Sequence, residues 1–426
     1  MQNMKNSGIE WIGDIPEHWS VKPIRALFEE VTLKNKLGDV KNALKFTYGR
    51  IVPKGDFDAD EDDYVANTIL NYTIVDPGTI MLNGLNLNFD FVSQRIGLVT
   101  ERGVITSAYL SFKPMSEEIL PEYANYLFKA YDGRKAFHNM GGGVRKILNF
   151  SELKKQYFIY PDVMEQTCIV NYLDVKCSEI ESLVADIQTQ IEEMELYKRA
   201  VIIETVFRGL NKSAKYKDSG IEWVGEIPDS WEVHPVYSYF CERKVKNKLG
   251  KEENLLSLSY GKIVQKDINT SDGLLPESFN TYNIVEPGDI IIRPTDLQND
   301  KRSLRTGLVK DHGIITSAYI DLMPISTIDT RYFHYLLHAY DVKKVFYNMG
   351  NGVRQGLNYS EFSRLMVFEP TYEEQVTIAD YLDGKITEID SIIEMKKQQL
   401  QIIDDYKRTL IFEFITGKKE VPADVG

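Results

Sequence analysis

The chain has 426 residues, of which 43% are hydrophobic and 27% charged, as is typical of globular proteins. The sequence has no run of 18 apolar residues, no signal-peptide core and only three scattered cysteines, which excludes a membrane span and a disulfide framework and predicts a cytoplasmic protein. The net charge of −13 argues weakly against nucleic-acid binding, because phosphate contacts require lysine and arginine.

The sequence is duplicated. Residues 7–16 return as residues 219–228, and all four tryptophans lie in or just after these two segments. Other matched pairs follow in the same order, namely 95–99 with 305–309, 106–109 with 316–319, and 139–145 with 348–354. A repeat of about 210 residues is too long for a solenoid and long enough for a core of its own, so it indicates a domain duplication. Two such units predict a pseudo-twofold molecule, which suits a partner with twofold symmetry.

The larger part of each copy, residues 1–160 and 213–370, is predicted to be a mixed domain with many short strands. Residues 72–82 have the pattern of a strand, a turn at Asp76-Pro77-Gly78 and a second strand, and residues 282–292 repeat it. Helices are expected at 122–135 and 330–344, where aromatic residues recur at helical spacing. Because strands and helices do not alternate regularly, the fold class is α+β and not a doubly wound parallel sheet.

The smaller parts, residues 161–212 and 371–426, are predicted to be long helices. Residues 165–208 contain neither glycine nor proline, and apolar residues recur every seven positions in both copies. Such a stripe must be buried, so we expect the two helices to pair as a coiled coil; the alternative is that each lies on its own domain. With 5 basic and 10 acidic residues in the first helix and 7 and 12 in the second, each carries a net charge of −5.

The sequence contains no catalytic or cofactor-binding constellation. A dinucleotide fingerprint, a Walker loop, a nucleophile elbow and a zinc-binding helix are all missing from it. Residues 141–143 are three glycines, but no Lys-Ser or Lys-Thr follows, so they are interpreted as a tight turn and not as a phosphate cradle. His138 aligns with Tyr347 in the second copy, which excludes a duplicated catalytic histidine. We therefore expect a protein that is not an enzyme and needs no cofactor of its own.

Two loops of different content lie between matched segments. Residues 83–94 stand opposite residues 293–304, and both loops are rich in side chains that hydrogen-bond to base edges. The alternative is that they are ordinary polar loops. As base-reading candidates we name Asn83, Asn86, Asn88 and Gln94 in the first loop and Asp296, Gln298, Asn299, Lys301 and Arg302 in the second.

Contacts to a nucleic-acid backbone are expected from basic residues in corresponding positions. Arg145 and Arg354 each follow a glycine-rich turn that would let the chain approach a ligand closely. The alternative is that each arginine only supports its own turn. The full set of backbone candidates is Lys34, Lys36, Arg145, Lys246, Lys248 and Arg354.

These motifs together resemble the specificity subunits of type I restriction–modification systems. The resemblance is carried by the Trp-Ile-Gly-Asp-Ile-Pro start at Trp11, the Thr-Ser-Ala-Tyr core at Thr106, the Gly-x-Gly-Val-Arg turns, and the Glu-Gln…Tyr-Leu-Asp helix starts at Glu165 and Glu374. It extends over the whole chain. Two segments depart from the pattern: residues 206–209 replace Ile-Thr-Gly-Lys, and residues 161–164 are a degenerate proline-rich entry.

The resemblance implies two target-recognition domains, each followed by a spacer helix, with the helices antiparallel and each domain reading half of a bipartite DNA site. It also implies two methyltransferase subunits, which bring S-adenosylmethionine, and ATP-dependent restriction subunits as partners. The remaining alternative is a non-catalytic coiled-coil scaffold with two carbohydrate- or peptide-binding domains, given the 25 tyrosines.

Overall fold

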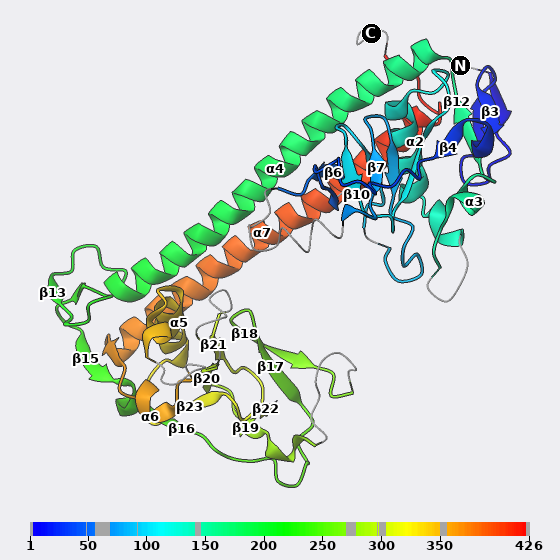
Figure 1. Ribbon diagram of the computed structural model, residues 1–426. Helices are drawn as coiled ribbons and strands as arrows, with labels where there is room; N and C mark the ends of the chain where they lie inside the picture. The colour runs from blue at the N-terminus through cyan, green and yellow to red at the C-terminus, as the bar shows by residue number, and fades with distance from the viewer. Residues whose placement is uncertain are drawn as a thin grey trace. The chain divides into compact units, whose positions relative to one another are not determined.

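The computed structural model describes residues 3–47, 49–55, 69–91, 93–140, 146–269, 278–295, 297, 304–349 and 356–422. The chain divides into two compact units. Unit 1 comprises Met1–Ile187 with Gln398–Gly426, and unit 2 comprises Gln188–Lys397. Two long helices, α4 (Val163–Arg208) and α7 (Tyr372–Ile415), each contribute residues to both units (Figure 1). The predicted α+β class is confirmed, and no helix in the described ranges is long and apolar enough to cross a membrane.

Unit 1 is built from short antiparallel strands. Its four-stranded sheet has the order β4 (Phe28–Glu30), β11 (Leu110–Pro114), β8 (Ile80–Leu82) and β9 (Ile96–Leu98). Four two-stranded sheets pair β1 (Met4–Asn6) with β2 (Asp14–Pro16), β3 (Ser20–Pro23) with β12 (Tyr157–Tyr160), β5 (Leu44–Thr47) with β6 (Arg50–Pro53), and β7 (Thr73–Val75) with β10 (Gly103–Ile105). The strand–turn–strand prediction for residues 72–82 is confirmed, although β7 and β8 belong to different sheets.

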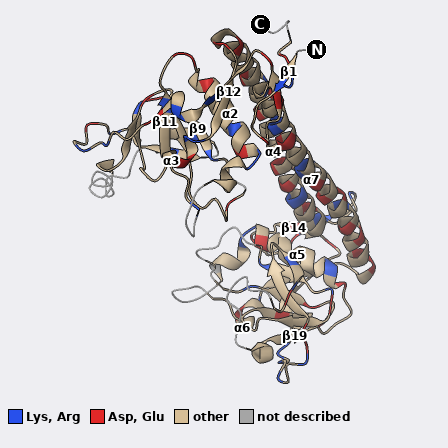
Figure 2. Ribbon diagram, turned by 90° about the vertical axis from the view of Figure 1, so that its right-hand side faces the viewer, with Lys and Arg blue, Asp and Glu red and all other residues tan. Residues whose placement is uncertain are grey.

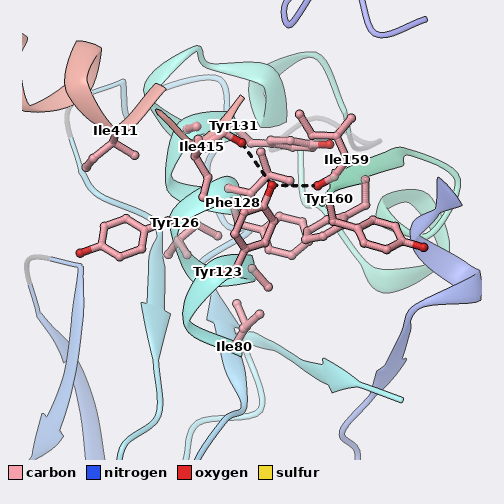
Figure 3. Packing of buried hydrophobic residues seen from close by; sticks show 14 of the residues in the cluster. Ile80, Tyr123, Tyr126, Phe128, Tyr131, Ile159, Tyr160, Ile411 and Ile415 are labelled. Atoms are coloured by element: carbon pink, nitrogen blue, oxygen red, sulfur yellow. Dashed lines mark hydrogen bonds between the residues drawn. The ribbon is translucent and has the colours of Figure 1, made fainter. Parts of the chain in front are cut away.

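Helix α2 (Pro121–Gly133) is the centre of the core of unit 1. Proline occupies its first turn, where the missing N–H is not needed, and the predicted helix at 122–135 is confirmed within two residues. The Tyr123 hydroxyl donates toward the carbonyl oxygens of Ile159 and Ile415, both at 3.3 Å (Figure 3). The other helical elements of unit 1 are η1 (Ile24–Ala26), η3 (Ala136–Asn139) and α3 (Phe150–Leu153), which Asn149 caps.

Unit 2 has a similar topology, except that the counterparts of the pairs β5-β6 and β7-β10 are joined into one four-stranded sheet. Its four-stranded sheets have the orders β16-β23-β20-β21 and β18-β17-β22-β19, and β13 pairs with β14 and β15 with β24. The strands are β13 (Tyr216–Asp218), β14 (Glu226–Pro228), β15 (Glu232–Pro235), β16 (Phe240–Glu242), β17 (Leu255–Ser259), β18 (Lys262–Lys266), β19 (Asn283–Val285), β20 (Ile290–Ile292), β21 (Thr306–Leu308), β22 (Gly313–Ile315), β23 (Ile320–Pro324) and β24 (Met366–Glu369). The helices are η4 (Val236–Ser238), η5 (Phe279–Thr281), α5 (Thr330–Val342), η6 (Val345–Asn348) and α6 (Tyr359–Phe362).

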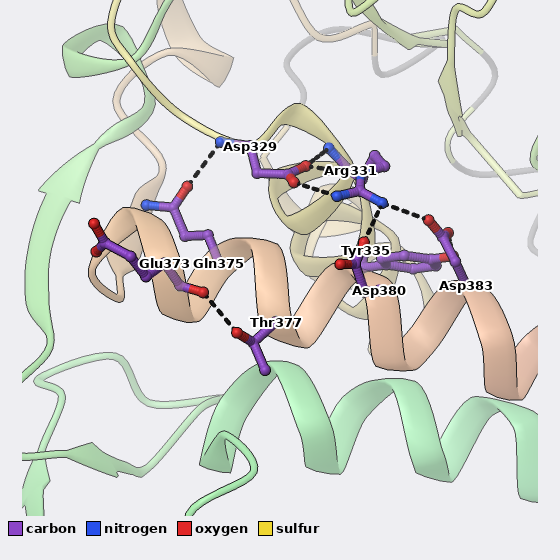
Figure 4. Close-up of polar contacts among 8 residues, drawn as sticks. All are labelled: Asp329, Arg331, Tyr335, Glu373, Gln375, Thr377, Asp380 and Asp383. Carbon is purple, nitrogen blue, oxygen red and sulfur yellow. Dashed lines mark hydrogen bonds and ion pairs between the residues drawn. The ribbon is translucent and has the colours of Figure 1, made fainter.

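The repeated Trp and Glu-Gln motifs join each domain to the start of the long helix that follows it. In unit 1, the indole N–H of Trp19 donates to Glu165 at 3.0 Å, and in unit 2 Trp231 donates to Glu374 at 3.0 Å. The side chain of Gln166 is fully buried and accepts from the backbone N–H of Leu120 at 2.9 Å. Figure 4 shows the equivalent contact of unit 2, where Gln375 accepts from the N–H of Asp329 at 2.9 Å. These motifs therefore attach each domain to the start of the long helix that follows it.

Within each unit the two long helices are in contact. In unit 1 the rings of Tyr172 and Phe414 lie 4.5 Å apart, and Lys407 donates to Glu181 at 2.8 Å. In unit 2 Lys198 donates to Asp390 at 2.5 Å. Lys396, which interrupts the heptad pattern of the second helix, donates to Gln190 at 2.5 Å. Apolar residues of both long helices therefore lie in the core of each unit together with residues of the domain.

Candidate nucleic-acid interface

The variable loop of unit 1, residues 83–94, lies at one end of the two layers of strands. Leu82 at the end of β8 is opposite Ile96 at the start of β9, so the loop leaves and re-enters the sheet at the same end of the strands. Thr73 at the start of β7 is opposite Ile105 at the end of β10. Both pairs of strands extend in the same direction from the turn at Asp76–Thr79. Hydrogen bonds join this turn to Val99, the residue after β9. Thr73 and the variable loop are therefore at the same end of the unit.

A fully buried arginine, Arg95, binds the backbone of this loop. The Arg95 guanidinium donates to the carbonyl oxygens of Asn83 at 2.9 Å, Leu85 at 2.8 Å and Asp90 at 2.6 Å. Its backbone N–H donates to Asp132 at 2.7 Å, and burial raises the pKa of that carboxyl. Because an arginine presents several donors in a rigid fork, one side chain fixes the path of several residues.

Unit 2 uses the same clamp. Arg305, also fully buried, donates to the carbonyl oxygens of Thr295 at 2.6 Å and Arg293 at 3.3 Å. Its Nε donates to the Tyr347 hydroxyl at 3.2 Å. In unit 1 His138 takes the place of Tyr347, and its Nε2 lies 3.0 Å from the Asp90 carbonyl oxygen. In the sequence these arginines are visible as part of the matched segments, and the signal for their role is that each stands directly after one of two unlike loops.

The four base-reading candidates of the first loop lie at this end of unit 1. The Asn83 side chain accepts from the backbone N–H of Leu85 at 3.2 Å and so takes part in the turn itself. Asn86 is exposed and has a left-handed backbone with φ of +53°. Asn88 is half-buried, and Gln94 is exposed and packs on Gly49. Asn86 and Gln94 are thus the two best placed for an outside partner.

The second group of base-reading candidates cannot be placed in the same way. Asp296, Gln298, Asn299, Lys301 and Arg302 lie outside the described residues, as do Arg145 and Arg354. Their roles remain predictions. In the first loop the structure adds two candidates, Phe89 and Phe91, which a search of the sequence for polar side chains does not select. Phe89 is 74% exposed and Phe91 is 53% exposed, and an apolar side chain at a DNA surface can contact the thymine methyl group.

The predicted backbone lysines lie close to the same end. The Lys34 ammonium donates to the hydroxyls of Ser107 at 2.5 Å and Thr73 at 3.2 Å, so Ser107 of the Thr-Ser-Ala-Tyr segment is one of its partners. In unit 2 Lys246 donates to the Thr281 carbonyl oxygen at 3.0 Å. Lys36 and Lys248 are exposed. The structure therefore brings Lys34, Lys36 and the first variable loop to one end of unit 1, while their contact with DNA stays a prediction.

An ion triad attaches the neighbouring hairpin to the long helices in each unit. In unit 1 Glu181 of α4 pairs with Arg50 of β6 and with Lys407 of α7. In unit 2 Asp390 of α7 pairs with Lys262 of β18 at 3.3 Å and with Lys198 of α4. Since most of these side chains are partly exposed, each pair stabilises the unit only slightly, but it fixes where the hairpin lies on the helices.

No protein-family model matches the chain. It is 24% identical to the putative type I restriction enzyme MjaX specificity subunit of Methanocaldococcus jannaschii, over 96% of each chain. It is also 24% identical to the MjaVIII specificity subunit of the same organism, over 96% of this chain and 94% of that one. Among solved structures, a chain from a study of complex assembly and conformational transition of the type I R-M system matches with a TM-score of 0.70. This match has 12% identity and covers 95% of this chain and 99% of that one.

The two kinds of comparison agree with each other and with the repeated motifs. The relatives match almost end to end, so both copies of the repeat and both long helices are included. The structural match, at low identity, shows that the fold is shared. The resemblance inferred from the motifs is thereby confirmed: along almost its whole length, this chain is a relative of the type I restriction enzyme specificity subunits.

Proposed function

We propose that this chain is the DNA-recognition subunit of a type I restriction–modification complex. Residues 1–160 and 213–370 are its target-recognition domains, and each reads one half of a bipartite site. One observation carries the proposal: in both copies a matched, buried arginine holds the backbone of a loop whose side chains differ between the copies. A rigid frame with exchangeable side chains is what sequence reading requires. The full-length relatives are named specificity subunits, which supports the same function.

Residues 161–212 and 371–426 are the spacer helices, and they pair as an antiparallel coiled coil that sets the distance between the half-sites. The contacts within each unit support this. In unit 1 residue 172 meets 414 and residue 181 meets 407, so numbers rise along one helix as they fall along the other. In unit 2, 190 meets 396 and 198 meets 390. The corresponding contacts of the two copies also support a pseudo-twofold relation between the domains.

The chain itself is not an enzyme in this proposal. Two methyltransferase subunits bring S-adenosylmethionine, restriction subunits bring the ATP-dependent reaction, and the complex works on DNA in the cytoplasm. The relatives' title of specificity subunit supports a part in such a complex. Figure 2 shows acidic and basic residues along both spacer helices, whose net charge of −5 each suits contact with protein partners more than with phosphates. A scaffold with carbohydrate- or peptide-binding domains has no support among the relatives.

The proposal is tested by co-expressing the chain with the methyltransferase subunits of its own complex. Methylome sequencing should show one methylated motif made of two half-sites and a gap of fixed length, and the complex should retard a duplex that carries it. The isolated chain should not turn over S-adenosylmethionine. Methylation without a bipartite motif, or activity of the purified chain alone, would contradict the assignment.

A further inference from the structure

One short run of sequence is identical in the two copies although its neighbours are not. Residues 34–38 and 246–250 both read Lys-Asn-Lys-Leu-Gly. The three residues before each run and the three after it share no identity between the copies. We call these two runs the lysine–leucine tips. Either the fold or an outside partner requires each of these identical residues, and the contacts of each residue decide between the two.

The fold explains the asparagine and the glycine. Asn35 is 2% exposed, donates to the Val40 carbonyl oxygen at 2.8 Å and accepts from the Val40 N–H at 3.2 Å. Asn247 makes the same two bonds with Glu252, at 2.9 and 3.2 Å. Gly38 and Gly250 have left-handed backbones, with φ of +70° and +60°. The first lysine of each run is also held by hydrogen bonds within its unit. Each tip is thus a rigidly built turn.

The fold does not explain the second lysine and the leucine. Leu37 is 85% exposed and Leu249 is 76% exposed, so neither contributes to a core. Lys36 and Lys248 make no hydrogen bond or ion pair with any residue in the described part of the chain. A single exposed leucine is common on protein surfaces, but here the same exposed pair stands at the apex of the same turn in both copies. An outside partner is therefore the better explanation.

The tips stand at the end of the unit that carries the variable loop. Lys34 forms a bridge with Thr73 at the start of β7, and β4 leads toward it from Phe28. Met115, just after β11, marks the opposite end, because its N–H donates to the Leu27 carbonyl oxygen at 2.9 Å. In unit 2 Lys246 forms the corresponding bridge with Asn283 at the start of β19. A ligand that covers the variable loop therefore has the tip within its reach.

We propose that the tips are a second DNA contact of each recognition domain, in which the lysines bind phosphates and the leucine packs against the sugars that line the adjacent groove. This rests on the proposed function and adds an apolar contact to it. Each five-residue tip has two positive charges and no negative one, which fits the DNA backbone. Apolar side chains that enter a DNA groove between phosphate-binding lysines are a known way to anchor a protein. The contact reads no base, so it supplies affinity to all sequences alike.

The test uses the complex with its methyltransferase subunits and a duplex carrying the site found by methylome sequencing. Leu37→Ala with Leu249→Ala should weaken binding about tenfold, on specific and unrelated duplexes alike, and leave the salt dependence unchanged. Lys36→Gln with Lys248→Gln should lower the slope of log affinity against log salt by about two. That difference in salt response cannot come from a merely structural role, and thermal unfolding of all variants should match that of the wild type.

The matched control is Met115→Ala with Ile325→Ala. These residues occupy corresponding positions after β11 and β23, are 49% and 53% exposed, and Met115 lies at the opposite end of its unit, so DNA affinity should not change. If the leucine variant binds DNA normally, or loses its methyltransferase subunits in gel filtration, the tips are not a DNA contact. If the wild-type complex binds no DNA at all, the proposed function itself is wrong.

Discussion

A Cβ atom on Gly417 would lie 3.0 Å from Cζ2 of Trp19, and one on Gly209 would lie 3.1 Å from Cζ2 of Trp231. Both glycines follow the end of a long helix and have left-handed backbones, with φ of +69° and +68°. The glycine after each long helix therefore packs closely against the buried tryptophan of its unit. This gives the Gly of the terminal Ile-Thr-Gly-Lys motif a packing reason as well as a conformational one.

Gly417→Ala should destabilise unit 1 by about 2–3 kcal/mol, from the left-handed backbone together with the crowding against Pro16 and Trp19. Thermal unfolding followed by tryptophan fluorescence measures this loss. Gly384→Ala is the control in the same helix, because a Cβ there meets no atom within 4 Å. That substitution should leave stability equal or raise it by up to about 1 kcal/mol. Equal effects of the two substitutions would mean that this close packing is unimportant.

Replacing residues 83–94 by residues 293–304 should change the first half-site of the DNA target toward the second. The clamp should accept the exchange because Arg95 and Arg305 bind the loops mainly through backbone carbonyls, and the loop carboxylate that pairs with Arg95, that of Asp90, lies 3.6 Å away. Each well-placed bidentate contact discriminates between bases by about 1–3 kcal/mol, so methylome sequencing will detect the change. An active complex with its original half-site would place the reading residues elsewhere in the domain.

Removing one heptad from each spacer helix should shorten the gap and leave both half-sites intact. Deleting residues 188–194 and 397–403 retains Glu181, Lys407, Lys198 and Asp390, so both ion triads survive. The spacer loses about 10 Å at about 1.5 Å per residue, which corresponds to roughly three base pairs of DNA at about 3.4 Å each. Deleting four residues from each helix is the control, since it puts the apolar stripe out of phase and should abolish assembly. If the heptad variant still methylates sites with the original gap, the spacer helices do not set the distance between the half-sites.

Unit 2 should be less stable in acid than unit 1 because of two histidines of α5. Burial lowers the pKa of His334 to about 4 and that of His338 to about 3, the latter also beside His334, Lys198 and Arg199. The folded pKa is below the unfolded value near 6.5, so the penalty is absent at neutral pH and grows as pH falls below about 6.5. At pH 5 it reaches roughly 2 kcal/mol for each histidine.

Hydrogen exchange resolved by segment measures this, and unit 1 serves as an internal control because Asn125 and Lys129 stand at the matching positions. His334→Asn, which restores the residue of unit 1, should make unit 2 more resistant between pH 6.5 and 4. Identical acid profiles of the two units would show that these histidines take up protons without unfolding.

Asp321→Asn should stabilise unit 2 at neutral pH. Burial and the neighbouring Asp289 raise the pKa of Asp321 to about 8, while Arg243 pairs mainly with Asp289, at 2.7 Å. For an acid with a raised folded pKa, stability falls as pH rises from about 4 to about 8, and is level beyond that. The asparagine cannot ionise, so the variant should gain about 2–4 kcal/mol at pH 7 and lose this pH dependence. Thermal unfolding from pH 4 to 8 checks it, with Ser111→Asn at the matching position of unit 1 as control. A parallel pH profile of wild type and variant would contradict it.

The sequence predicts the duplication, the α+β class and the long helices because each depends on patterns that occur twice or extend over many residues. The repeated position of Arg95 is visible in the sequence, but its partners at residues 83, 85 and 90 were not predictable, because they depend on how the loop folds back over it. The exposure of Leu37 was missed for a related reason: apolar residues are assigned to a core unless the turn that carries them is known. Asn83 was selected for polarity alone, and its side chain accepts a hydrogen bond within its own turn, so its contact with DNA stays a prediction.

Unit 2 is one continuous stretch, Gln188–Lys397, whereas unit 1 joins Met1–Ile187 to Gln398–Gly426. During synthesis, everything that unit 2 needs has been made before residue 398 is added. Unit 1, although its first residues precede those of unit 2, lacks Phe414, Ile415 and Gly417 until after the whole of unit 2 has been made. The usual order, in which amino-terminal domains fold first, is thus reversed. A chain that stops before residue 398 leaves Trp19 and Tyr123 without their contacts to Gly417 and Ile415, so only chains that extend past residue 417 can close both domains.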